Sequence, residues 1–149
     1  MTIESQKGID TIMFAPQSVG DGATISARVD TTGAKWVTIR VHLAAEETAS
    51  ATATVLSLLE SDDTVVTNFA TITADLAPDA QTAHIVRYEV ACGAARKRFL
   101  RLTWKSGTET GSIQILSAIA TLSRNALAPA TLAELPTSAS GTDVILVAN

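Results

Sequence analysis

The 149 residues are enough for one ordinary domain with a hydrophobic core that needs no disulfides or metals. Hydrophobic residues make up 46% and charged residues 17%, which excludes an intrinsically disordered polyanion even though the formal net charge is -4. A chain with this small negative charge has no overall attraction for nucleic acid or a membrane surface, so we expect neither as a partner. The single cysteine, Cys92, excludes an internal disulfide and a cysteine metal cluster.

The first residues give no sign of a targeting segment. Residues 1–7 contain no charged region followed by an apolar stretch, and no apolar run in the chain is long enough for a transmembrane helix. We therefore expect a protein that is made in a cytoplasm and does not enter a membrane.

Alternation of apolar and polar residues with period two predicts strands in the first part of the chain. The first two are expected at residues 11–15 and 23–29, with turns at Gly20-Asp-Gly and at Thr32-Gly33. The clearest strand is residues 36–43, where one face is entirely apolar and the other polar. The residues that we expect to face the core are Val37, Ile39, Val41 and Leu43.

The segment 44–59 begins with good helix formers and then becomes rich in Thr and Val. We interpret it as a short turn followed by a strand over 51–59. Further strands are expected at 66–72 and 83–91.

Two more strands follow in the second half. Residues 98–105 alternate again, with Leu100, Leu102 and Trp104 on the core face. Gly107 and Gly111 predict a tight hairpin into residues 112–122, which are apolar on both faces and therefore typical of a central strand. About eight strands predict an all-β fold, a jelly-roll-like antiparallel β-sandwich.

The composition changes after Arg124 to Ala, Pro, Ser and Thr, which predicts a sandwich domain over 1–125 and an extended C-terminal arm over 126–149. The arm ends in the apolar stretch Val144, Ile145, Leu146 and Val147. Such a stretch can return to its own sheet or complete the open edge of a neighbouring subunit, and we favour the first alternative.

Candidate catalytic residues are few. Neither His42 nor His84 lies near a nucleophile motif or a metal-type partner, and we interpret both as exposed sheet histidines. Cys92 follows a strand and is expected to pack as a small apolar residue. No glycine-rich phosphate loop is present. We expect no enzyme, no cofactor and no metal.

The densest acidic group is Glu60, Asp62 and Asp63. Crowded carboxylates can bind calcium or act as acid and base, but their spacing does not match a calcium loop. Asp and Ser also stabilise turns by accepting backbone N–H bonds, and we favour a turn here.

The one basic cluster consists of Arg96, Lys97, Arg98 and Arg101. It can meet phosphate or the acidic surface of another protein, or it can simply be the solvated start of a strand. Aromatic residues are only 4% of the chain, too few for base stacking on single-stranded nucleic acid. A protein partner is therefore the preferred functional interpretation.

Several segments resemble small structural proteins of tailed phages. They are Leu56-Ser-Leu-Leu-Glu-Ser-Asp-Asp63, Phe69-Ala-Thr-Ile72, Arg98-Phe-Leu-Arg-Leu-Thr-Trp104 and residues 112–122, and the resemblance spans about 36–124. It implies a decoration or cement protein, made in the host cytoplasm and located on the outer capsid surface of the virion. Its implied partners are the major capsid protein and itself, as a homotrimer around local three-fold axes.

The sequence is compatible with three functional classes. In the first, a capsid-binding structural protein, the basic cluster and residues 144–147 carry contacts between subunits. The second is a tail-associated or glycan-binding module, for which Trp36 is the available aromatic because Trp104 is expected in the core. An enzyme ranks last, since no pair of residues has the types and spacing that a mechanism needs.

Overall fold

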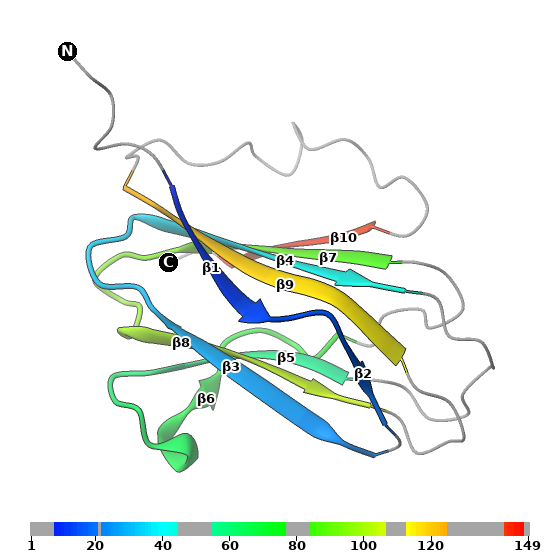
Figure 1. The fold of residues 1–149 in the computed structure, drawn as a ribbon. Coiled ribbons are helices and arrows are strands. Elements are labelled where there is room, and N and C mark those ends of the chain that lie inside the picture. Colours follow the sequence, from blue (N-terminus) through cyan, green and yellow to red (C-terminus); the bar gives the residue numbers. More distant parts are fainter. Residues whose placement is uncertain are drawn as a thin grey trace.

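The computed structural model describes residues 8–20, 22–44, 55–76, 84–106, 113–124 and 142–147. These residues form two sheets that lie face to face as the layers of a β-sandwich (Figure 1). The described part contains strands and one 3-10 turn, and no α-helix. The all-β sandwich predicted from the sequence is thus confirmed.

One layer is a six-stranded sheet with the order β1-β9-β4-β7-β10, in which β2 pairs with β9 beyond the end of β1. Its strands are β1 (Ile9–Phe14), β2 (Gln17–Val19), β4 (Trp36–Leu43), β7 (His84–Ala91), β9 (Ile113–Ser123) and β10 (Thr142–Val147). The other layer is a four-stranded sheet with the order β3-β8-β5-β6. Its strands are β3 (Thr24–Asp30), β5 (Val55–Ser61), β6 (Ala70–Thr71) and β8 (Phe99–Lys105).

Four of the strand pairs are nested within one another along the chain. The pairs are β1 with β9, β3 with β8, β4 with β7 and β5 with β6, and all are antiparallel. Consecutive strands often lie in different layers, so that the chain passes repeatedly from one sheet to the other (Figure 1). The arrangement resembles a long hairpin that has been folded over into two layers.

The predicted hairpin at Gly107 and Gly111 is wrong. The strands on either side, β8 and β9, belong to opposite sheets and do not pair with each other. Glycines in a short polar stretch permit a sharp change of direction, but they do not decide whether the next strand joins the same sheet. The connection itself, 107–112, lies outside the described residues.

The strand predicted at 66–72 is also mostly wrong. Val66–Asn68 form a 3-10 turn, η2, and only Ala70–Thr71 pair as a strand. The Asp63 carboxylate accepts hydrogen bonds from the Val65 backbone N–H at 2.8 Å and from Asn68 Nδ2 at 2.7 Å. A turn held by its own side chains competes with strand pairing in this segment.

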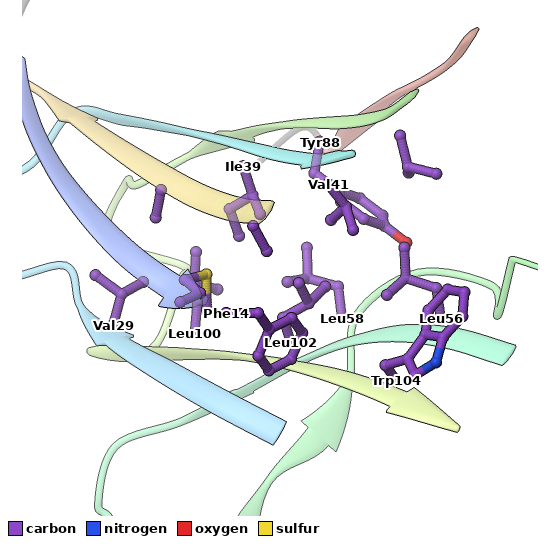
Figure 2. Packing of buried hydrophobic residues seen from close by; sticks show 14 of the residues in the cluster. Phe14, Val29, Ile39, Val41, Leu56, Leu58, Tyr88, Leu100, Leu102 and Trp104 are labelled. Atoms are coloured by element: carbon purple, nitrogen blue, oxygen red, sulfur yellow. The ribbon is translucent and has the colours of Figure 1, made fainter. Parts of the chain in front are cut away.

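The core lies between the two layers (Figure 2). From the six-stranded sheet, Ile39, Val41 and Tyr88 point toward the other layer, where Leu102 and Trp104 meet them. The predicted alternation of both clear strands is confirmed, because their apolar faces are buried. These buried residues are Val37, Ile39, Val41, Leu43, Leu100, Leu102 and Trp104. Strand β9 is central, between β1 and β4, as its two apolar faces predicted.

Both predicted turns are present. Ala23 N–H donates to the Gly20 carbonyl at 3.1 Å, and Ala34 N–H donates to the Thr31 carbonyl at 2.9 Å. Gly33 has a φ of 79°, a left-handed conformation that favours glycine over residues with a Cβ. The turn at Gly33 joins β3 in one layer to β4 in the other.

Strand β10 runs parallel to β7 along the edge of the six-stranded sheet, from Thr142 opposite Ile85 to Val147 opposite Val90. Strand β9 also runs parallel to β7, since both are antiparallel to β4. Strands β9 and β10 therefore run in the same direction within this sheet. The residues between them, 125–141, lie outside the described part.

Candidate functional site

Three of the four predicted basic residues gather at one end of the sandwich. Arg96, Lys97 and Arg98 lie in the connection between β7 and β8, beside the turn between β3 and β4. Together the two connections line an open depression of about 360 Å³. Besides the basic residues, its lining includes Thr31 and Thr32 from the turn between β3 and β4 and Cys92 from the connection between β7 and β8. Thr31 Oγ1 donates a hydrogen bond to the Arg98 carbonyl at 2.7 Å and so ties the two connections together.

Each of these three basic side chains meets a carboxylate of the same chain. Arg96 lies 3.4 Å from Glu60, Lys97 lies 3.8 Å from Asp62, and Arg98 lies 2.6 Å from Asp30. The positive charge that the sequence concentrates here is balanced by acidic residues from β3 and from the end of β5. A phosphate or an acidic partner would have to compete with these carboxylates.

The ion pair between Arg98 and Asp30 is the shortest of the three. Arg98 Nε lies 3.1 Å and Nη2 lies 2.6 Å from Asp30 Oδ2, while Thr32 donates to Oδ1 through both its backbone N–H and its hydroxyl. Arg98 above all, and then Thr32, hold the pKa of Asp30 well below its usual range. Asp30 thus closes the turn that leads into β4.

The acidic residues Glu60, Asp62 and Asp63 do not converge on a common point. Glu60 accepts from Arg96 and from the Lys97 backbone N–H, whereas Asp62 faces the Lys97 side chain. Asp63 stabilises the turn at η2, and the hydrogen bond from Asn68, followed by that from Val65, lowers its pKa. Within the described ranges, no group of three possible metal ligands occurs.

The candidate nucleophile and bases are spread over different elements. Cys92, at the end of β7, is half-buried against the core, and burial raises the pKa of its thiol, which disfavours the thiolate. His42 on β4 is half-buried and has its Nδ1 3.4 Å from Ser117 Oγ on β9. No carboxylate in the described part hydrogen-bonds to His42. The side chain of His84, the first residue of β7, lies outside the description.

Arg101 is separated from the other three basic residues, because it lies on β8 and points away from the core. It faces solvent on the outer surface of the four-stranded sheet, directly opposite Arg28 on β3. Sequence reasoning missed Arg28. Only the register between β3 and β8 places it beside Arg101, and residue spacing alone does not reveal that register.

The other residues predicted to make contacts lie in β10 and at the two tryptophans. The backbone of Val144, Ile145, Leu146 and Val147 forms most of β10, whose side chains lie outside the description. Trp104 is fully buried, as expected, and Trp36 is half-buried at the start of β4. In the described part no helix is long and apolar enough to cross a membrane.

Comparisons with known proteins do not assign the chain to a family. No protein-family model matches it, and a search of curated proteins also finds no match.

Proposed function

We propose that this chain is a non-enzymatic structural protein of a tailed virus particle, which decorates or cements the outer surface of the shell. Its partners in this proposal are the major capsid protein and two further copies of itself. The observation that carries the proposal is the nested strand order, β1 with β9, β3 with β8, β4 with β7 and β5 with β6. We infer that this order is that of a jelly roll, an architecture common among viral capsid and lectin domains.

The segments that resemble tailed-phage proteins support the proposal by their position. Residues 56–63, 69–72 and 98–104 contribute to β5, β6 and β8, which are neighbours in the four-stranded sheet. A cement protein repeats one modest interface many times over a lattice and needs a rigid scaffold with accessible edges. The sandwich provides such a scaffold, and β10 lies at the outer edge of one of its sheets.

The test is the copy number of the protein in purified virus particles produced from the genome that encodes it. Quantitative mass spectrometry would compare it with the major shell protein. A copy number close to that of the shell protein supports decoration or cementing. A few copies per particle would contradict it in favour of a tail-associated role, and absence from the particle would contradict both.

A glycan-binding module is the second candidate, because lectin domains share the jelly-roll architecture. The specific observation is Trp36, whose partly exposed side chain starts β4 on the outward face of the six-stranded sheet. An aromatic ring of this kind can stack on a sugar. Binding to a glycan array that is lost in Trp36→Ala and retained in Arg40→Gln would favour this function over the first.

A further inference from the structure

Two arginines face each other on the outer surface of the four-stranded sheet. Arg28 on β3 and Arg101 on β8 are directly opposite in the antiparallel register, while their neighbours Val29 and Leu102 are buried. Like charges at such cross-strand positions repel each other and destabilise a sheet. An anion bound between the two guanidinium groups would remove this repulsion.

No carboxylate of the described chain compensates this pair. Arg28 donates to the Thr64 carbonyl at 3.2 Å, and Arg101 donates to the Val66 carbonyl at 3.4 Å and to Ser26 Oγ at 2.9 Å. All three acceptors are neutral. A guanidinium has five N–H donors, so both side chains are held in place while they keep donors for a further acceptor.

A second pair of opposed arginines in the same chain has a carboxylate beside it. Arg40 on β4 and Arg87 on β7 are also directly opposite, on the outer face of the six-stranded sheet. There Arg87 forms an ion pair with the carboxylate of Glu89, which is completely buried. The Arg28 and Arg101 pair differs in that no such carboxylate of the described chain lies beside it.

The space around Arg28 and Arg101 is a small pocket of about 210 Å³. Its lining includes Phe69, whose ring centroid lies 5.5 Å from the Arg101 guanidinium, and Val66. The wall at η2 is held by Asp63, through Val65 N–H and Asn68. The volume is below the roughly 300–1,000 Å³ of typical small-molecule sites and suits a single side chain.

The surroundings of the pocket favour a polypeptide as the occupant. Val65 and Val66 are 53% and 61% exposed, so an apolar surface adjoins the two positive charges. Arginine also matches the geometry of a carboxylate, which can accept two parallel N–H bonds. A polyphosphate chain is the less favoured occupant, because a protein with a formal net charge of -4 has no overall attraction for it.

We propose that the Arg28–Arg101 pocket is a docking site for an Asp or Glu side chain of a partner protein, with Val65 and Val66 contacting an apolar residue beside it. The site does not depend on the partner being a capsid protein. It also moves the expected partner contact away from Arg96, Lys97 and Arg98, whose charges are already balanced within the chain.

The test uses the full chain and two blocked peptides, acetyl-Val-Asp-Glu-Leu-amide and its uncharged counterpart acetyl-Val-Asn-Gln-Leu-amide. Side-chain Nε–H signals of the arginines are followed by NMR during each titration. We expect the signals of Arg28 and Arg101 to shift with the acidic peptide only, and the shift to weaken as salt is added. Arg28→Gln and Arg101→Gln should each weaken binding about ten-fold, whereas Arg40→Gln should leave it unchanged.

Three results would overturn the proposal. One is the absence of any shift with the acidic peptide. Another is stronger binding of inorganic phosphate or of a short single-stranded oligonucleotide at the same signals, which would assign the pocket to phosphate. The third is an unchanged affinity for the acidic peptide in both Arg28→Gln and Arg101→Gln, which would show that the peptide binds without the two guanidinium groups.

Discussion

At the scale of single residues, the sequence pattern does not predict that a charged side chain on the outer face of a sheet is buried. Glu89 alternates with the core residues Tyr88 and Val90, so periodicity places it on a polar face, yet its side chain is completely buried. It accepts a hydrogen bond from Thr38 Oγ1 at 2.6 Å and forms the ion pair with Arg87. A buried carboxylate with two partners tolerates little change.

Replacing this carboxylate should be costly. Glu89→Ala removes one partner of the Arg87 pair and is expected to lower the free energy of unfolding by about 3 kcal/mol. Asp62→Ala is the control, because Asp62 is 74% exposed and its ion pair with Lys97 is 3.8 Å long; it should cost less than about 1 kcal/mol. Urea unfolding curves measure both. Equal losses in the two variants would contradict the interpretation of Glu89.

Asp30 gives a prediction for pH. Its pKa is lowered in the folded state, so its stabilising effect is complete above the ordinary Asp pKa of 3.8 and is lost as the pH falls below it toward the folded value. The urea midpoint of the wild type should therefore fall below about pH 4. In Asp30→Asn this acid-dependent fall should be smaller than in the wild type. An unchanged pH profile in Asp30→Asn would refute the assignment.

At the scale of elements, the turns and clear strands followed from local sequence, because alternation and glycine act over a few residues. The turn at Gly33 permits a sharp test. Gly33→Ala places a Cβ on a residue with a φ of 79° and should cost about 1–2 kcal/mol. Gly20→Ala is the matched control, since Gly20 has no positive φ and a Cβ there would meet nothing within 4 Å. Thermal unfolding compares the two, and an equal effect would contradict the turn argument.

The C-terminal strand gives a second prediction at this scale. Deleting residues 126–149 removes β10 from the edge of the six-stranded sheet but leaves the four nested strand pairs intact. We expect cooperative unfolding to persist, with weaker binding to virus particles in a co-sedimentation assay. A shortened chain that no longer unfolds cooperatively would show that β10 is part of the folding unit.

At the scale of the whole molecule, the β-sandwich could be predicted from the sequence but the assignment of strands to layers could not. Periodicity identifies which face of β4 or β8 is buried, and it carries no information about which strand lies alongside. The predicted hairpin between β8 and β9 failed for this reason. The candidate site shows the same limit, because Arg28 and Arg101 meet only through the register of β3 against β8. Ion pairs such as Arg98 with Asp30 likewise depend on that tertiary placement.

The nested pairing also has a consequence for synthesis on the ribosome. Strand β1 is made well before its partner β9, which begins only at Ile113, roughly 100 residues later. At about 5–20 residues per second, β1 waits on the order of 5–20 s before its partner exists. Until β7 and β8 have also been made, β4 has no neighbour in its own sheet, and the apolar side of Val37, Ile39 and Val41 lacks the complete four-stranded sheet that covers it in the fold. The newly made N-terminal half is thus the stage at which this protein is most exposed to aggregation and to chaperones.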